Sequence, residues 1–173
     1  MNKNITYYFI TAGLFILLKL WFTIAGNNDL MFLLEPTDRF VGLITGSNSV
    51  YFSDSGYYHD KLNILIDKSC SGFNFWILGF VVFTYLALKY FDKPLHKVLT
   101  IPAALLCAYV LTIFVNASRI YASVIVQTQT INIMPEQQHI VHEAVGIIIY
   151  LSFLVLAYYL IERFLIQHYA KLS

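Results

Sequence analysis

Four long apolar stretches, separated by polar segments, dominate the pattern of this chain. They cover residues 5–25, 73–91, 98–115 and 144–161. Each approaches the length of about 20 mostly apolar residues that a helix needs to cross the hydrocarbon core of a bilayer. The last two contain no charged residue, and the first carries Lys19 near one end, where a long side chain can reach the interface. We therefore predict four transmembrane helices.

The composition supports this prediction. Hydrophobic residues make up 58% of the 173 positions and charged residues only 12%, which is too apolar for a soluble domain of this size. A net charge of +1 provides no basic face for nucleic acid. The first span is longer than the roughly 7 to 15 apolar residues of a signal peptide, and no cleavage site of small residues follows it. The expected fold is an all-α integral membrane protein, a single membrane domain over residues 1–173.

Residues 26–72 form a long polar segment with turn signals of its own. Clusters of Asn, Asp, Ser, Pro and Gly mark turns at 27–29, 35–38 and 53–56. We expect short helices over 29–34 and 39–44, and a small hairpin that pairs 50–52 with 62–66. Our hypothesis is that this segment covers the site and contacts the recognition motif of a substrate, and the alternative is an ordinary packed loop.

Lysine and arginine residues are unevenly distributed around the spans. Those close to the span ends lie before the first span, between the second and third, and after the fourth: Lys3, Lys89, Lys93, Lys97, Arg163 and Lys171. Residues 126–141 contain no Lys or Arg, and residues 26–72 contain three against six acidic residues. Because Lys and Arg are retained on the cytoplasmic side, we predict a multi-pass membrane protein with both termini in the cytoplasm and these two segments outside.

This topology places three chemically capable residues on the outer side of the membrane. Cys70 precedes the second span, Arg119 lies just beyond the outer end of the third, and His142 precedes the fourth. Taken alone, the cysteine is compatible with a residue that merely flanks a span, and the arginine with a lipid-headgroup anchor. Ionisable residues near membrane helices seldom lack a role, so their convergence predicts a catalytic site.

The two cysteines differ in their settings. Cys70 lies where a polar run gives way to an apolar helix, and Asp67, Ser69 or Ser71 can cap that helix. A thiol in the first turn meets the positive end of the helix dipole, which favours the thiolate. Cys107 lies deep in the third span, about 12 residues before Arg119 and so roughly 18 Å deeper along the same predicted helix. It is too far from Cys70 for a disulfide, and we interpret it as a packing residue.

Candidate partners for the Cys70 thiol lie at the third and fourth spans. If the third helix continues past its apolar stretch, Asn116, Arg119 and Ser123 share one polar face at i, i+3 and i+7. Arginine stays charged and donates up to five hydrogen bonds, so Arg119 can stabilise a thiolate or a tetrahedral oxyanion. His142 is the expected general acid and base, and His139 is the competing base.

A metal site is an alternative use of these histidines. His139 and His142 share a helical face, but the order H-x-x-H-E differs from the zincin pattern H-E-x-x-H, and no clear set of further ligands accompanies them. Glu143 falls on a different face from His142 and is expected to pair with His139 or to cap the helix. We expect no metal and no other cofactor. The remaining histidines, interpreted as surface or interfacial residues, are His59, His96 and His168.

Three short motifs together resemble the signatures of the exosortase and archaeosortase family. They are Cys70-Ser71-Gly72 before one span, Asn116-x-x-Arg119-Ile120 at the end of a later one, and His142-x-x-x-Gly146 opening the next. The outer segment is most similar to the short exosortase K branch through Leu33-Leu34-x-Pro36, Thr45-Gly46, Gly56-Tyr57-Tyr58 and the run 66–70. The resemblance covers roughly residues 31–151, and the order and spacing of the motifs are more specific than any one of them.

The resemblance implies a membrane-embedded cysteine protease and transpeptidase that cleaves C-terminal sorting signals of surface or secreted proteins at the outer face of the inner membrane. Cys70 would be the nucleophile, His142 the acid and base, and Arg119 the electrostatic partner. Supporting or substrate-binding positions would be Asn116, Ser69, Ser71, His139, Tyr57 and Tyr58. The implied partners are membrane-anchored proteins that carry such a signal, and the lipid bilayer. Many family members have more spans than the four expected here.

Other functions use the same features differently. A non-enzymatic four-helix membrane scaffold needs no reactive thiol, whereas a membrane S-acyltransferase also uses a Cys-His pair. Acyltransferase sites usually face the cytoplasm, which argues against that alternative for an outward-facing Cys70. In the exosortase-like mechanism, water or an outside amine or hydroxyl would release the Cys70 thioester, and both outcomes stay open.

Overall fold

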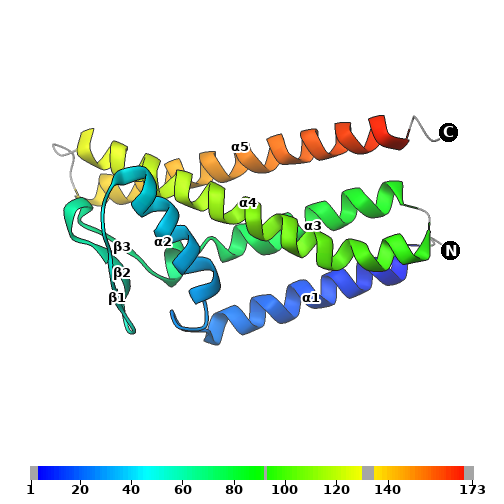
Figure 1. Cartoon of the computed structure of the whole chain (residues 1–173), viewed down its shortest axis with the longest axis horizontal. Helices are drawn as coiled ribbons and strands as arrows, with labels where there is room; N and C mark the ends of the chain where they lie inside the picture. Colours follow the sequence, from blue (N-terminus) through cyan, green and yellow to red (C-terminus); the bar gives the residue numbers. More distant parts are fainter. Residues whose placement is uncertain (1–3, 92, 130–134, 170–173) are drawn as a thin grey trace. The chain divides into compact units, whose positions relative to one another are not determined.

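The computed structural model of the chain (Figure 1) describes residues 4–91, 93–129 and 135–169, with side chains described for all of them except 128–129, 135–142 and 168–169. Its helices are α1 (Ile5–Ile24), α2 (Met31–Thr45), α3 (Phe73–Tyr90), α4 (Pro94–Gln129) and α5 (Pro135–Tyr169). Its strands are β1 (Val50–Phe52), β2 (Gly56–His59) and β3 (Ile64–Ile66). Two 3₁₀ turns lie at Asp60–Leu62 and Lys68–Cys70.

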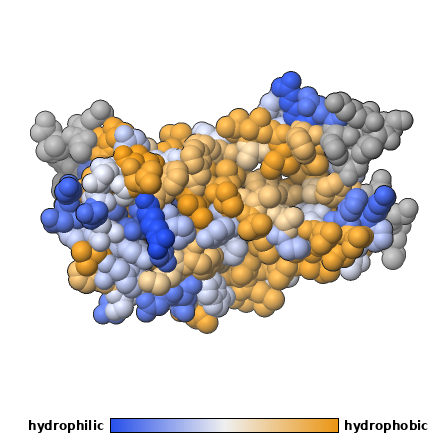
Figure 2. Space-filling model, in the orientation of Figure 1, coloured by the Kyte–Doolittle hydropathy of each residue, from blue (hydrophilic) through white to orange (hydrophobic). Residues whose placement is uncertain are grey.

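Within the described residues, four helical segments are long and apolar enough to cross a membrane: Ile5–Ile24, Lys68–Tyr90, Pro94–Gln127 and Glu143–Gln167. They match the four predicted spans and confirm an all-α integral membrane protein. Many large apolar side chains on these helices are exposed, and Figure 2 shows such side chains over much of the visible helical surface. Apolar surface of this extent is unfavourable in water, so lipid is the environment that suits it.

The chain divides into two compact units, and α4 and α5 each contribute to both. The first unit consists of Met1–Ile24, Phe73–Leu111 and Leu154–Ser173. The second consists of Ala25–Gly72 and Thr112–Phe153. The proposed catalytic positions 70, 119 and 142 therefore all belong to the second unit.

In the first unit, α1 and α3 lie side by side (Figure 1). Phe80 and Phe83 of α3 pack there in a buried cluster with Ala104 and Ala108 of α4, whose small side chains allow close approach. Cys107 is exposed, so the prediction that it is a packing residue is wrong. It lies beside the stripe formed by Ala104 and Ala108, on an exposed part of α4.

In the second unit, α2 is one continuous helix where the sequence predicted two short helices and a turn. Pro36 cannot donate a hydrogen bond to the Phe32 carbonyl, which weakens the helix locally. However, Leu33, Thr37 and Val41 recur at helical spacing and are fully buried. Burial of this stripe outweighs the local turn signal. The turn signals at 27–29 and 53–56 are confirmed, since both segments are turns in the structure.

The outer segment also contains a three-stranded antiparallel sheet in the order β1-β2-β3. β2 pairs with both neighbours, with Tyr51 opposite Tyr57 and Ile66 opposite Tyr57 on the other side. The predicted hairpin between 50–52 and 62–66 is therefore wrong. The turn at 53–55 is short enough to pair β1 with Gly56–His59 first, and Asn63, in the left-handed conformation, then turns the chain back as β3.

Candidate functional site

Cys70 lies in a 3₁₀ turn, Lys68–Cys70, that precedes α3. The Asp67 carboxylate caps this turn, because its Oδ1 accepts from Ser69 N at 2.9 Å and from Cys70 N at 3.3 Å. Asp67 therefore caps this turn, whereas the sequence predicted it as a candidate cap of the spanning helix itself, and Ser69 Oγ also donates to it at 2.6 Å. The thiol was expected in the first turn of the spanning helix; the structure places it three residues before Phe73, the first residue of α3.

Lys68 ties the Cys70 turn to the beginning of the outer segment. Its backbone N–H donates to Asn27 Oδ1 at 2.8 Å, and its Nζ donates to the Ala25 carbonyl oxygen at 2.7 Å. Both bonds join residues more than 40 positions apart. The first residue of the turn that carries the thiol is therefore fixed by two long-range hydrogen bonds.

Gly72 allows this turn to lie directly against α4. Its φ of +72° belongs to the left-handed region that favours glycine, and a Cβ there would lie 3.0 Å from both Asn116 Cγ and Thr112 Cγ2. Any larger residue would push the turn away from the helix. The glycine of the Cys-Ser-Gly motif thus brings the Cys70 backbone within reach of the Asn116 side chain.

Asn116, Arg119 and Tyr150 form a hydrogen-bonded network next to Cys70. Asn116 is fully buried, and its Nδ2 donates to the Cys70 carbonyl oxygen at 2.5 Å. Arg119 Nη1 donates to Tyr150 Oη at 3.3 Å and to Asn116 Oδ1 at 3.4 Å, and Tyr150 Oη donates to Asn116 Oδ1 at 2.6 Å. Arg119 also interacts electrostatically with the Cys70 side chain. The structure therefore brings Cys70, Asn116 and Arg119 together, with the fixed positive charge beside the thiol.

Tyr150 is the member of this network that sequence reasoning missed. It lies inside the fourth apolar stretch, where an aromatic residue is usual in a membrane helix and carries no signal by itself. The available signal was its spacing, because positions 142, 146 and 150 recur every four residues on one face of α5. The Arg119 guanidinium also stacks on the Tyr150 ring, with Cζ 5.4 Å from the centroid.

His142 and His139 lie in the helical part of α5, but their side chains are outside the described residues. The backbone still places position 142 near the network. A Cβ added at Gly146 would lie 2.9 Å from Arg119 Nε, so the arginine packs directly on α5 at that point. Position 142 is one helical turn, or about 6 Å along the axis, before Gly146. The glycine of the His-x-x-x-Gly motif is thus the residue that admits Arg119.

The other predicted site residues fall into two groups. Ser69 Oγ lies 3.8 Å from Cys70 Sγ, and Ser71 is buried within the same turn. Tyr57 and Tyr58 lie on opposite faces of β2. Tyr58 is partly exposed and donates to Asn63 Oδ1 at 3.2 Å.

Tyr57 is largely buried, and its ring centroid lies 4.7 Å from that of Tyr51. Burial raises the pKa of Tyr57, and the nearby carboxylates of Glu35 and Asp38 raise it further. The hydroxyl therefore stays neutral around physiological pH. Of the two tyrosines, the partly exposed Tyr58 is the better placed to contact another molecule.

A second buried polar cluster, the His59 cluster, consists of Asp38, Ser47, Ser49 and His59. His59 Nε2 lies 2.8 Å from Asp38 Oδ1, and His59 Nδ1 lies 3.2 Å from Ser47 Oγ. Ser49 Oγ donates to the other Asp38 oxygen at 2.9 Å. His59 is completely buried, so its interpretation as a surface or interfacial residue is wrong. The pairing of β2 with the strands around it carries His59 inward against α2, where Asp38 meets it.

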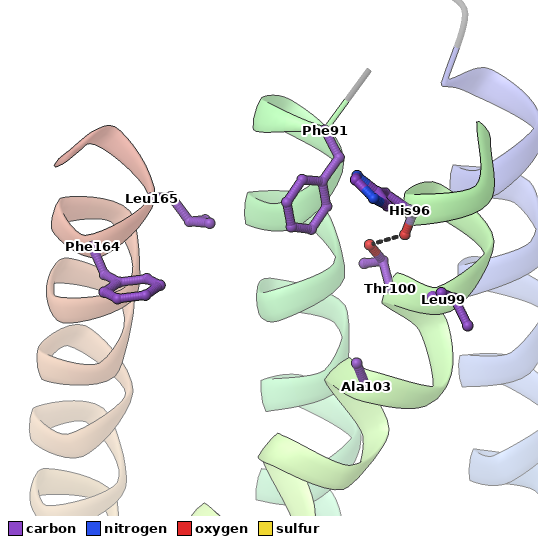
Figure 3. A pocket seen from close by; sticks show the side chains of 7 residues that line it. All are labelled: Phe91, His96, Leu99, Thr100, Ala103, Phe164 and Leu165. Atoms are coloured by element: carbon purple, nitrogen blue, oxygen red, sulfur yellow. Dashed lines mark hydrogen bonds between the residues drawn. The ribbon is translucent and has the colours of Figure 1, made fainter. Parts of the chain in front are cut away.

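Two cavities of the structure are lined by residues outside the network of Cys70, Asn116, Arg119 and Tyr150. One, of about 470 Å³, lies beside the His59 cluster. The other, of about 390 Å³ (Figure 3), belongs to the first unit and is lined by Phe91, His96, Leu99, Thr100, Ala103, Phe164 and Leu165. Its lining is mainly apolar, and Thr100 Oγ1 is bonded within α4 to the His96 carbonyl oxygen at 2.8 Å. Neither cavity is lined by a cysteine.

The described residues contain no group of three His, Cys, Asp or Glu side chains close enough to hold a metal ion. Comparison with family models shows a match of residues 31–159 to the model described as transmembrane exosortase (Exosortase_EpsH). The matched region covers most of the chain and contains Cys70 and the whole network of Asn116, Arg119 and Tyr150. No curated protein and no solved structure matches the chain.

Proposed function

Because the chain belongs to the transmembrane exosortase family, we propose that it is a membrane-embedded cysteine peptidase or transpeptidase that cleaves the C-terminal sorting signals of membrane-anchored proteins. The observation that carries this proposal is the hydrogen-bonded network that holds the Arg119 guanidinium next to Cys70, because Asn116 bonds both to Arg119 and to the Cys70 carbonyl oxygen. A guanidinium beside a thiol favours the thiolate, which is the nucleophilic form of cysteine.

Arg119 is also the donor best suited to a developing oxyanion. The Cys70 N–H is bonded to the Asp67 carbonyl oxygen at 2.9 Å, and the Ser71 N–H to the Lys68 carbonyl oxygen at 3.2 Å. These backbone donors are occupied within the turn. The negative charge that forms on a peptide carbonyl during attack therefore falls to the guanidinium, which acts most strongly where water is excluded.

The proposed reaction begins with attack of the Cys70 thiolate on the carbonyl carbon of the sorting signal. A C–S bond forms, the tetrahedral oxyanion collapses, and the C–N bond breaks. His142 takes the thiol proton and delivers it to the leaving amine. The product is a thioester on Cys70, which water would release as a carboxylic acid, whereas an amine or a hydroxyl would release it as an amide or an ester. The position of residue 142, one turn from the Arg119 contact on α5, supports this role.

We propose that the site faces outward at the inner membrane and that both termini are cytoplasmic. The distribution of Lys and Arg supports this orientation. Labelling of intact cells with a membrane-impermeant maleimide tests it in a Cys107→Ala background, which leaves Cys70 as the one remaining cysteine. Labelling before lysis supports an outward thiol, and labelling only after lysis contradicts it.

We also propose that the outer segment contacts the substrate's recognition motif, with Tyr58 as a contact residue. Gly56 is unsuitable for testing this idea, because its φ is +105° and a Cβ there would clash with the Ile66 carbonyl oxygen. The partly exposed Tyr58 is the better choice. Tyr58→Ala should reduce processing of the substrate while the Cys70 alkylation rate stays unchanged, and normal processing would contradict the contact.

The central test is mass spectrometry of C-terminal peptides from membrane and surface fractions of host cells. Cells carrying Cys70→Ala are compared with cells carrying the wild-type chain or the matched control Cys107→Ala. We expect a defined set of proteins to keep the C-terminal hydrophobic helix only with Cys70→Ala. Identical profiles at equal expression would overturn the peptidase proposal and favour a membrane scaffold.

A further inference from the structure

The hydroxyl of Tyr150 contributes contacts that the proposed reaction does not use. It accepts from Arg119 Nη1 at 3.3 Å and donates to Asn116 Oδ1 at 2.6 Å. The face of its ring meets the guanidinium of the same arginine. One side chain of α5 thus holds two side chains of α4 through two different groups.

These contacts determine which way the Asn116 amide faces. Arginine has only hydrogen-bond donors, so the Asn116 atom that lies 3.4 Å from Arg119 Nη1 must be the amide oxygen. Tyr150 already accepts from Arg119, which leaves its own hydrogen for the same oxygen. The amide NH₂ is then directed at the Cys70 carbonyl oxygen, 2.5 Å away.

The fully buried position of Asn116 makes this orientation matter. A reversed amide would place its NH₂ against the donors of Arg119 and its oxygen against the Cys70 carbonyl oxygen. Both contacts would be repulsive, and no bulk water would replace the lost hydrogen bonds. The hydroxyl of Tyr150 adds to the preference for the productive orientation and links it to the position of the guanidinium.

We propose that Tyr150 is a positioning residue of the Cys70 site, which acts by fixing the Asn116 amide and by holding the Arg119 guanidinium beside the thiol. The effect of Tyr150 on catalysis rests on the proposed function. Its effect on the Cys70 thiol does not, because these contacts are present in the chain before any substrate binds. The reactivity of Cys70 can therefore be measured separately from the cleavage of any sorting signal.

The test measures the rate at which iodoacetamide alkylates Cys70 at one fixed pH, in the full chain in detergent and in a Cys107→Ala background. Tyr150→Phe removes the hydroxyl and keeps the ring. We expect alkylation to slow by about threefold to tenfold, the range that loss of one hydrogen bond gives. Tyr150→Leu removes the ring as well and should slow it further. Tyr159→Phe is the matched control, since Tyr159 lies on the same helix and is exposed, and its rate should not change.

A double-mutant cycle separates positioning through Asn116 from a general effect on packing. Tyr150→Phe should have a smaller effect on the alkylation rate in an Asn116→Ala background than in the wild-type background, because the acceptor of the hydroxyl hydrogen is gone and only the hydrogen bond from Arg119 remains to be lost. An equal effect in both backgrounds would overturn the proposal. If Asn116→Ala does not fold, the single variant decides: an alkylation rate for Tyr150→Phe equal to that of Tyr159→Phe overturns it.

The result is distinguishable from failure of the proposed function. If Cys70→Ala leaves sorting-signal processing unchanged, the peptidase proposal fails, yet the alkylation rates still decide the role of Tyr150. If Cys70→Ala abolishes processing while Tyr150→Phe leaves both alkylation and processing unchanged, only the positioning role is overturned.

Discussion

The second unit contains two buried polar networks that look alike in composition but end differently. In the His59 cluster, both ring nitrogens and both Asp38 oxygens meet another member of the cluster, so the network closes on itself. The network of Asn116, Arg119 and Tyr150 instead ends on Cys70, whose side chain is only partly buried. Buried hydrogen bonds alone thus do not distinguish a candidate catalytic site from a purely structural network.

The two networks also differ in their charge. In the His59 cluster, the Asp38 carboxylate is matched by an imidazole and a hydroxyl at hydrogen-bonding distance. In the Cys70 network, the described members provide one fixed positive charge, Arg119, and its natural counterpart is a thiolate or an oxyanion. We infer that the first network stabilises the outer segment and that the second is prepared for an anion which forms during reaction.

The strongest test of this difference between the two networks is to remove the positive charge of the Cys70 network. Arg119→Gln should reduce sorting-signal processing by about 10² to 10³-fold, the loss typical for one oxyanion donor. It should also slow alkylation of Cys70 at fixed pH. Arg119→Lys should restore little, because an ammonium cannot contact Asn116, Tyr150 and the thiol together. Processing within twofold of wild type for Arg119→Gln would mean that the charge has no part in the reaction.

Removing the imidazole of the His59 cluster should have the opposite signature. His59→Ala leaves the buried Asp38 carboxylate with the Ser49 hydroxyl but without its imidazole partner, which costs about 3 kcal/mol. The expected fall in Tm is roughly 6 to 12 °C for a chain of this size, measured in detergent. Variants that remain folded should alkylate Cys70 at the wild-type rate. A large loss of alkylation in folded protein would show that the two networks are coupled.

A single methyl group at Gly146 tests how closely Arg119 is fitted against α5. The Cβ of Gly146→Ala would lie 2.9 Å from Arg119 Nε, so the flexible arginine has to move. We expect processing to fall by about tenfold, which corresponds to about 1.4 kcal/mol of transition-state stabilisation, with little change in Tm. Gly13→Ala is the matched control, since no atom lies within 4 Å of the added Cβ. Equal processing by the two variants would contradict the close fit.

The smallest effect is expected at Ser123, the third member of the predicted polar face of α4. Its side chain is buried, and its hydroxyl has no hydrogen-bond partner in the part of the chain that the structure describes. Ser123→Ala should therefore change the free energy of unfolding by no more than about 0.5 kcal/mol. Processing should stay within twofold of wild type. A tenfold loss would assign Ser123 to the Cys70 network.

The parts of the structure that followed from the sequence are those set by one strong physical demand. A bilayer requires long apolar helices, and so hydropathy located the spans. The predicted topology put Cys70 and Arg119 on the same side of the membrane. The i, i+3 spacing of Asn116 and Arg119 placed both side chains on one face of the helix, and in the structure that face meets Cys70. The roles of Cys70, Arg119 and His142 remain predictions, and so does the assignment to the exosortase K branch.

The parts that did not follow depend on contacts between distant residues. His59 and Asp38 are 21 positions apart, and they meet only because β2 lies between two strands, a register that the turn signals did not reveal. Pro36 suggested a break, but buried residues on either side keep α2 continuous. Tyr150 was hidden by its apolar neighbours, since its hydroxyl matters only when Arg119 and Asn116 lie beside it.

The two hydrogen bonds of Lys68 have a consequence for how this protein can diversify. They join the start of the outer segment, at Ala25 and Asn27, to the residue that begins the Cys70 turn. The segment between Asn27 and Lys68 therefore starts and ends at neighbouring points, which these hydrogen bonds hold together. Insertions, deletions and exchanges are tolerated best where the ends of a segment are held in this way. We therefore expect the sequence between these ends to tolerate change while Cys70 stays in its place.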